Sequence, residues 1–276
     1  MSAIAQLLVR QGLRDGFRQQ GHRLFGPCPV HGGDNPRAFV VDLRGDRWYC
    51  FTGCQRGGGP ATLARALGLP SGGMPPYVPP PPSPPFVPYT RRLGLTPGGP
   101  WLRAKGIYPA VCRDREVGAW AGRGMLRDCI ALRLHDTNGA PLGYAGRRLD
   151  PEEVRRRGKW VFPPRLPKSQ LLYGLHRVRG TRIVLTECSW GVLRLAQLGI
   201  DAVALLGVGL SNVQATHLEA FDRVVVLLDG DDAGQAASRP IAARLQAPIA
   251  TLPPGADPDD LDDESLRALL LPFLMP

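Results

Sequence analysis

The sequence predicts a multidomain α+β protein: an N-terminal β-rich module, a proline-rich linker, a small basic α+β subdomain and a C-terminal α/β domain with a parallel sheet. Three observations predict this class. Three of the six cysteines fall within residues 28–54, ten of the nineteen residues from Pro70 to Pro88 are proline, and short apolar strands alternate with helices after Arg182.

Composition narrows the class of protein. The chain has 276 residues and 43% hydrophobic content, enough for packed cores in two or three domains. No apolar run approaches the roughly 20 residues of a membrane span. The start, MSAIAQLLVRQGLRDGF, predicts a short amphipathic helix and not a signal peptide. Six cysteines are too sparse for a disulfide scaffold. We therefore expect a cytoplasmic protein with no membrane partner.

Charge is distributed unevenly along the chain, whose net charge is +10. Residues 91–179 hold 19 basic and 7 acidic residues, whereas residues 180–276 hold 6 basic and 13 acidic residues. A basic middle beside an acidic end indicates a groove for a polyanion, such as nucleic acid, next to a cation site. An ordinary solvated surface is the alternative interpretation.

The proline run predicts a domain boundary. Proline lacks the amide donor and fixes its own backbone torsion, so this stretch favours extended polyproline II. We expect a first domain at 1–68, a stiff linker at 69–90 and a basic subdomain at 91–179. The alternative is that the run is a ligand for a proline-binding domain.

Local patterns predict the elements of the basic subdomain. The segment WLRAKGIYPAVCRDREVG predicts helices that end at Gly106 and Gly118. The segment MLRDCIALRLHDTNGAPLGYAGRRL predicts a hairpin, because Asn138-Gly139 is a strong turn signal between two strand-like runs.

From Arg182 onward, strands and helices alternate. We predict strands at RIVLTE, DAVALLG, RVVVLLD and PIATLP, and helices at SWGVLRLAQLG, SNVQATHLEAF and DAGQAASRPIAARL. Ser211 and Gln214 are spaced as a capping box. Such alternation predicts a parallel sheet covered on both faces, over 180–255, followed by an acidic turn and helix at 256–276.

The cysteine-rich stretch has the spacing of a zinc ribbon. Cys28-x2-His31 and Cys50-x3-Cys54 flank FVVDL and RWYCF, which predict a β-hairpin that brings the two pairs together. Cys3His is a common tetrahedral zinc set, so we expect one structural Zn²⁺ per chain. The second pair is one residue wider than usual. His22 is an alternative to His31, with poorer spacing.

Carboxylates follow the predicted strands. Glu187 ends RIVLTE, Asp229 and Asp231 follow RVVVLL, and Asp257 lies in a later acidic turn. Because the carboxyl ends of parallel strands meet at one edge of a sheet, we expect these groups to lie together and to hold catalytic Mg²⁺ or Mn²⁺. A polar loop with aspartates that cap helices is the alternative.

Together these segments resemble the bacterial-type (DnaG-like) DNA primases. The zinc segment CPVH…WYCFTGCQRGGG, then WLRAKGI, GYAGRRL and KSQLLYGL, then VLTECSWGVLRLAQLG, VVVLLDGDDAGQAA and LPPGADPDDL follow the order of that family. The resemblance implies a Toprim catalytic fold. It implies that Glu187 is a metal ligand or proton-transfer group, that Asp229 and Asp231 are metal ligands, and that Asp257 and Asp259 form the late acidic motif.

The resemblance also implies an activity and its partners: primer synthesis on single-stranded DNA from nucleoside triphosphates by metal-dependent nucleotidyl transfer. A compact primase of a phage, plasmid or other mobile element fits, with a replicative helicase or element-encoded replication protein as a partner. The implied nucleotide and template contacts are Arg147, Lys159 and Lys168, and, on the zinc ribbon, Arg44, Arg47, Arg56 and an exposed Trp48 or Phe51.

The chain departs from the family in three places. Cys188 replaces the glycine after the glutamate, Gly191 replaces an acidic residue, and Trp160-Val161-Phe162 replaces a tyrosine-leucine-asparagine run. These departures keep open a catalytically degenerate protein that binds single strands or regulates replication. A Toprim nuclease or topoisomerase is a weaker alternative, with Tyr144 and Tyr173 as the candidate nucleophiles.

Overall fold

The computed structural model describes residues 2–33, 35–51, 53–72, 85–207 and 209–275. The chain divides into two compact units, Met1–Pro84 and Pro85–Pro276, which we describe separately. The predicted polyproline II conformation falls mainly on residues 73–84, outside the described residues. The finer domain limits given above remain a prediction.

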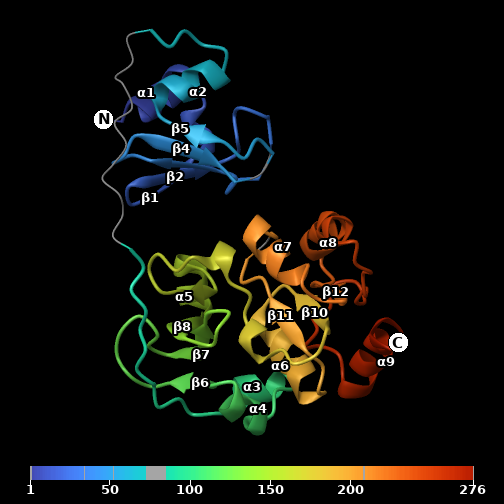
Figure 1. The fold of residues 1–276 in the computed structure, drawn as a ribbon. Helices are drawn as coiled ribbons and strands as arrows, with labels where there is room; N and C mark the ends of the chain where they lie inside the picture. Colours follow the sequence, from blue (N-terminus) through green and yellow to red (C-terminus); the bar gives the residue numbers. More distant parts are fainter. Residues whose placement is uncertain (1, 34, 52, 73–84, 208, 276) are drawn as a thin grey trace. The chain divides into compact units, whose positions relative to one another are not determined.

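The first unit is an antiparallel sheet with two helices (Figure 1). The strand order is β1-β2-β3-β4-β5, and β3 and β4 form the predicted hairpin. The elements are α1 (Ala3–Arg10), η1 (Arg14–Gly16), β1 (Arg18–Gln20), β2 (Arg23–Gly26), β3 (Phe39–Asp42), β4 (Arg47–Cys50), β5 (Gly57–Gly58) and α2 (Pro60–Ala66).

One face of this sheet packs on α1 and α2. Side chains alternate between the faces of a strand, so Phe39 and Val41 of β3 point inward with Trp48 of β4. The turn between β3 and β4 is tied to α1, because the Asp46 carboxylate accepts the amides of Ala3 and Ile4 at 2.8 and 3.0 Å. This turn therefore caps the helix that covers the sheet.

The second unit begins with a four-stranded antiparallel sheet, in the order β6-β7-β8-β9. The predicted hairpin is confirmed as β7 and β8. The elements are α3 (Pro100–Ala104), α4 (Pro109–Asp114), β6 (Val117–Trp120), β7 (Cys129–His135), β8 (Pro141–Arg148), α5 (Pro151–Arg157), β9 (Trp160–Val161), η2 (Lys168–Gln170) and η3 (Leu175–Arg177).

The predicted helix end at Gly118 is wrong, because Gly118 lies within β6. The helix stops at Asp114, and Glu116 takes a positive φ of 52° that turns the chain into the strand. Gly118 then pairs with Ala131, and a Cβ at this position would lie 2.4 Å from the carbonyl oxygen of Thr96. Glycine serves here for close approach of two backbones.

The rest of the second unit is the predicted parallel sheet, with β10 central in the order β11-β10-β12. The elements are β10 (Arg182–Thr186), α6 (Ser189–Gln197), β11 (Ala202–Ala204), α7 (Asn212–Leu218), β12 (Arg223–Leu227), α8 (Asp232–Leu245) and α9 (Asp263–Leu274). The capping box at Ser211 is present. None of the helices in the described ranges is long and apolar enough to cross a membrane.

Both faces of this sheet are covered, as predicted (Figure 1). Val184 packs in a core with Leu193 of α6, whereas Leu185 packs in a second core with Leu218 of α7 and Ile241 of α8. Alternating residues of one strand thus supply two cores.

The strand predicted at PIATLP is reduced to one bridge, between Val226 and Ile249. The Val226 amide donates to the Pro248 carbonyl and its carbonyl accepts the Ala250 amide, both at 2.9 Å. Prolines at 248 and 253 bound the segment, and proline cannot donate to a ladder.

Candidate functional site

The first candidate site is the Cys/His group of the first unit. The ligand atoms of Cys28, His31, Cys50 and Cys54 all lie within 4.8 Å of one another. Cys28 Sγ lies 3.6 Å from Cys54 Sγ, and Cys50 Sγ lies 3.7 Å from His31 Nδ1. Zn–S bonds of about 2.3 Å in tetrahedral geometry separate sulfurs by about 3.8 Å. The group therefore fits one zinc ion.

Two turns position these ligands. The Gly32 amide donates to the Cys28 carbonyl at 3.1 Å, which closes the turn that holds His31. Cys50 ends β4, and its amide donates to the Arg56 carbonyl at 2.9 Å, so the wider second turn also closes. His22 is not part of this group among the described residues. Burial raises the pKa of Cys28 to about 11 in the metal-free protein.

The expectation of an exposed Trp48 is wrong. The ring is 3% exposed, stacks on Phe39 at 5.1 Å and donates from Nε1 to Thr62 Oγ1 at 3.2 Å. Cys50 must point inward to join the metal group, and residues two apart in a strand share a face, so Trp48 points inward too. The exposed aromatic side chains of this segment are Tyr49 and Phe51, at 42% and 63%.

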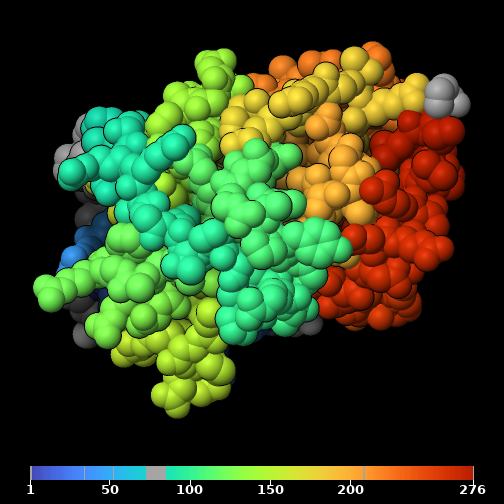
Figure 2. All heavy atoms as spheres, turned by 90° about the horizontal axis from the view of Figure 1, so that it is seen from below, coloured from blue at the N-terminus to red at the C-terminus, as the bar shows by residue number. Residues whose placement is uncertain are grey.

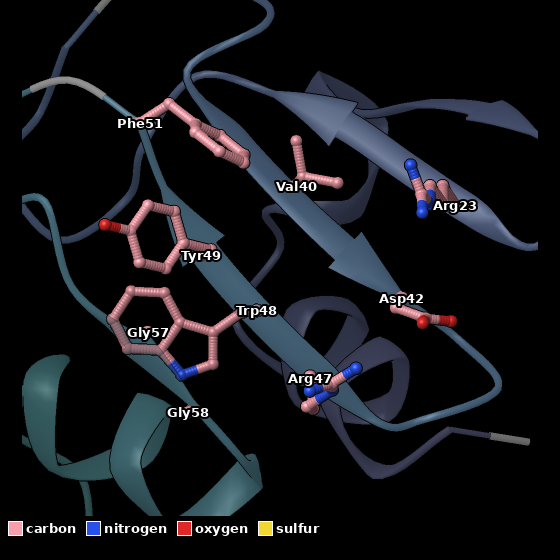
Figure 3. Close-up of a pocket in the computed structure, with 9 residues that line it drawn as sticks. All are labelled: Arg23, Val40, Asp42, Arg47, Trp48, Tyr49, Phe51, Gly57 and Gly58. Carbon is pink, nitrogen blue, oxygen red and sulfur yellow. The ribbon is translucent and has the colours of Figure 1, made fainter. Parts of the chain in front are cut away.

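The outer face of the sheet is hollowed (Figure 3). This hollow of about 490 Å³ is lined by Tyr49 and Phe51, by Arg23, Arg47 and Asp42, and by Val40, Trp48, Gly57 and Gly58. Tyr49 and Phe51 meet edge to face at 4.7 Å between centroids. Adjacent aromatic and arginine side chains suit single-stranded nucleic acid, which offers bases to stack and phosphates to pair.

Of the other predicted template contacts, Arg44 lies on the β3–β4 turn and lines a different hollow, with Ser2 and Val9 of the α1 side. Arg56 is exposed in the segment before β5. Sequence reasoning missed Arg23 and Tyr49. The two-residue alternation of RWYC, counted from Cys50 as an inward ligand, would have indicated Tyr49.

The second candidate site lies at the carboxyl ends of the parallel strands. Glu187 follows β10, and Asp229 lies two residues after the end of β12, the strand that pairs with β10. A later turn joins them: the Gly230 amide donates to the Ala256 carbonyl, and the Gly255 amide to the Gly230 carbonyl, both at 2.8 Å. This pairing brings Asp257 beside the strand ends.

Burial and mutual repulsion raise the pKa values of carboxylates in this group. Burial, then the charges of Asp257 and Glu187, raises the pKa of Asp229 to about 7. Burial, then Asp231 and Asp257, also raises the pKa of Glu187. The Oδ1 atom of Asp229 is buried and has no hydrogen-bond partner among the described residues. Among the described residues, only the Cys/His group has its ligand atoms close enough together to hold one ion as it stands. The repulsion among the carboxylates and the orphaned oxygen of Asp229 nevertheless favour a divalent cation such as Mg²⁺ or Mn²⁺ beside them.

Asp231 both caps a helix and contributes its charge to the acidic group. Its Oδ1 accepts the Gly234 amide at 2.7 Å and so caps α8, as the helix-cap interpretation predicts. Its charge nevertheless acts on both Glu187 and Asp229. The cap therefore orients a carboxylate that also belongs to the acidic group.

The predicted basic residues occupy different surroundings. Lys159 is exposed and its charge acts on Glu187, lowering the pKa of that carboxyl against the other effects. Arg147 of β8 is half-buried, with its guanidinium 5.9 Å from the Trp101 ring centroid. Lys168 Nζ lies 4.5 Å from the Phe162 ring centroid.

An aromatic cluster beside these residues was missed. Trp160 stacks on Trp190 at 5.3 Å and on Phe162 at 5.9 Å, and Trp101 meets Trp190 edge to face at 5.0 Å. The cluster joins β9 to α6, which begins directly after the Glu187–Cys188 pair. Its sequence signal was the replacement of the family run by Trp160-Val161-Phe162.

Comparison with known proteins agrees with this architecture. A Toprim-like family model matches residues 184–262. A DNA primase of Geobacillus stearothermophilus is 34% identical over 160 residues, covering 53% of this chain and 26% of that protein. A DNA primase of Legionella pneumophila is 35% identical over 200 residues, covering 62% of this chain and 33% of that protein. The chain is thus similar to DNA primases over 53–62% of its length, and the Toprim-like match includes Glu187, Asp229 and Asp257.

Solved structures of primases share the fold. The zinc-binding and RNA polymerase domains of the Aquifex aeolicus primase align with 99% of this chain and 83% of that chain, with a TM-score of 0.55 and 20% identity. A DnaG primase catalytic domain bound to single-stranded DNA aligns with 62% of this chain and 70% of that chain, with a TM-score of 0.53 and 23% identity. The chain spans about a quarter to a third of the length of the two DNA primases described above.

Proposed function

We propose that this chain is a DNA primase that synthesises short primers on a single-stranded DNA template by metal-dependent nucleotidyl transfer. One observation carries the proposal: Glu187, Asp229, Asp231 and Asp257 gather at one edge of a Toprim-like sheet, in a chain whose relatives are DNA primases. The ssDNA-bound relative supports the template class.

Each residue has a chemical task in this proposal. The four carboxylates hold Mg²⁺ or Mn²⁺, which when bound would lower the pKa of a primer 3′-hydroxyl and neutralise the incoming triphosphate. Glu187 and Asp229 must be ionised to bind a cation, although burial favours their protonated forms. Arg147, Lys159 and Lys168 bind phosphates of the template, primer or nucleotide.

The zinc-binding unit would grip the template on its outer sheet face. Tyr49 and Phe51 offer rings on which bases stack, and Arg23 and Arg47 lie beside them for phosphate contacts. We do not assign Trp48 to this contact, since its ring is part of the core. Zn²⁺ on the Cys/His group holds the fold of this unit.

The decisive experiment is a primer-synthesis assay. Purified zinc-loaded protein is incubated with a library of single-stranded templates, ribo- or deoxynucleotides and Mg²⁺ or Mn²⁺, and products are resolved on a denaturing gel. We expect short primers from the wild type and at least about a 100-fold loss in Asp229→Asn, since the ligand charge is removed. Asp232→Asn, an exposed neighbour in α8, is the matched control. If the wild type binds the template but makes no primers, the proposed primase activity is refuted.

That negative outcome would instead favour a degenerate single-strand-binding regulator. The Cys188 and Gly191 departures motivate this second candidate. In the structure Gly191 is a packing residue of α6: a Cβ there would lie 3.0 Å from Thr186 Cγ2. The acidic residue of the family could enter only if α6 moved away from β10.

A strand-breaking Toprim enzyme has less support. Such chemistry in a topoisomerase needs an accessible tyrosine, and the two candidates are buried: Tyr144 is 4% exposed and Tyr173 is 6% exposed. The Tyr144 hydroxyl also accepts the Leu93 amide at 3.0 Å. Nicking of supercoiled DNA by the purified protein would restore this alternative.

The cellular setting is part of the proposal. We infer that the chain acts in the cytoplasm, in replication of a phage, plasmid or other mobile element. A replicative helicase or an element-encoded replication protein would recruit it. Co-purification of the tagged chain from its host tests this partner directly.

A further inference from the structure

Lys105 lies at the junction between the α3–α4 turn and the late acidic turn. It caps the C-terminal end of α3, and its Nζ forms an ion pair with Asp259 and lies 3.9 Å from Asp260 Oδ1. The Asp259 side chain is only 1% exposed, and the Lys105 side chain is 29% exposed. A charged pair removed from water to this degree needs both partners.

Two hydrogen bonds close the acidic turn. The Asp257 amide donates to Asp260 Oδ2 at 2.8 Å, and the Asp260 amide donates to the Asp257 carbonyl at 3.0 Å. The turn therefore fixes where Asp257 and Asp259 lie relative to each other. Lys105 contacts the part of the turn that includes Asp259.

The same two segments are joined a second time through α6. Arg194, 3% exposed, donates to the carbonyl oxygens of Gly106 and Leu261 at 2.9 and 2.7 Å and pairs with Asp263 at 2.7 Å. Gly106 directly follows Lys105. The face seen in Figure 2 shows the green segment with α3 and α4 against the red C-terminal segment. Lys105 is thus held in place from both sides.

Two carboxylates of the late acidic turn consequently have different surroundings. Asp259 is buried against the Lys105 ammonium group, and its charge still helps to raise the pKa of Asp229 and Asp257. Asp257 acts on both Glu187 and Asp229 and forms no ion pair with Lys105 among the described contacts. Lys105 contacts Oδ2 of Asp259, so a divalent cation that used this oxygen would have to displace the lysine. The lysine already supplies the positive charge that this carboxylate requires.

We propose that Lys105 is a positioning residue that keeps Asp259 out of the divalent-cation ligand set and leaves Glu187, Asp229, Asp231 and Asp257 to form it. The inference rests on the proposed divalent site. It assigns different roles to the two aspartates of one motif, and it makes the α3–α4 turn part of the catalytic architecture.

The test measures Mn²⁺ binding by titration calorimetry and thermal unfolding of the zinc-loaded protein with and without added Mn²⁺, independently of primer synthesis. In Lys105→Met, we expect a lower Tm without Mn²⁺, at least about threefold tighter Mn²⁺ binding and a larger Mn²⁺-induced rise in Tm, because Asp259 is released and a cation is lost. The double variant Lys105→Met/Asp259→Asn should return Mn²⁺ binding toward the wild-type value. Arg103→Met, exposed on the same helix, is the control.

A second pair of variants tests the inference even if Lys105→Met fails to fold. Asp259→Asn should keep the wild-type affinity for Mn²⁺ within about twofold, whereas Asp257→Asn should weaken it about tenfold or more. Equal weakening in both variants, or weaker Mn²⁺ binding in folded Lys105→Met, would overturn the inference about Lys105 and leave the proposed divalent site standing. A wild type with no Mn²⁺ response would overturn the proposed divalent site, and this inference with it.

Discussion

The backbone of Gly230 exchanges two hydrogen bonds with the Gly255–Ala256 pair, donating to Ala256 and accepting from Gly255 at 2.8 Å. These bonds join the loop that carries Asp229 to the turn that carries Asp257. The third acidic segment is therefore placed by loop-to-loop pairing, because the strand expected before it amounts to a single bridge.

Gly230→Ala should separate these loops. An added Cβ would lie 2.4 Å from the Pro253 carbonyl oxygen and 2.9 Å from that of Ala256. We expect urea denaturation to show a loss of about 1–3 kcal/mol in the free energy of unfolding, together with a smaller Mn²⁺-induced rise in Tm. Gly94→Ala is the control, since nothing lies within 4 Å of its Cβ. An unchanged metal response in Gly230→Ala would contradict this account.

Without Mn²⁺, the protein should lose stability as pH rises. Burial and neighbouring carboxylates raise the pKa of Asp229 from 3.8 to about 7, so between these values the folded state binds more protons than the unfolded state. The free energy of unfolding therefore falls as pH rises from about 4 to 7, by roughly 1–2 kcal/mol once solvent screening is discounted.

In zinc-loaded protein without Mn²⁺, Asp229→Asn should remove most of this pH dependence and raise the Tm at pH 8, while it abolishes the Tm rise with Mn²⁺. Chemical denaturation at several pH values, with Asp232→Asn as the matched variant, measures both effects. A wild-type slope retained in Asp229→Asn would place the titrating group elsewhere.

Zinc should be required for the first unit to fold. Cys54→Ser removes one of four ligands, and structural zinc contributes on the order of 10 kcal/mol in small metal-dependent modules. We expect about one zinc per wild-type chain by elemental analysis and loss of the first unit's cooperative unfolding in Cys54→Ser. Cys129→Ser, a buried thiol of the second unit, should keep its zinc. Clearly less than one zinc per wild-type chain would contradict the assigned ligand set.

The outer sheet face should bind single-stranded DNA through its aromatic rings. Tyr49→Ala/Phe51→Ala should weaken binding by about 1–3 kcal/mol per stacked base in fluorescence anisotropy, with zinc content unchanged. Trp48→Ala should instead destabilise the first unit by about 3–5 kcal/mol, because it empties part of the core. Equal DNA affinity in the double variant and the wild type would move the template contact to another surface.

Much of the fold follows from local patterns in the sequence. The β7–β8 hairpin was predicted from Asn138-Gly139, and the parallel sheet from apolar runs long enough for strands but too short for helices. The gathering of Cys28, His31, Cys50 and Cys54 also follows from spacing, since two short ligand pairs flank one hairpin. In each case the partners lie close in sequence or share a regular repeat.

The parts that were missed depend on distant contacts. Lys105 and Asp259 are 154 positions apart, and nothing in either segment identifies the other as its partner. Whether Trp48 is buried depends on which face of β4 points toward the core. The aromatic cluster combines residues from three separate elements. Tertiary packing decides such features, and local propensity does not.

Trp48 and Cys50 share the inner face of β4, one as a core side chain and the other as a member of the Cys/His group. A one-residue slip of β4 against β3 would turn both outward together, emptying the core and removing a metal ligand in the same step. We therefore expect zinc to bind only when β3 and β4 are paired in the native register, because a slipped strand removes Cys50 from the ligand set.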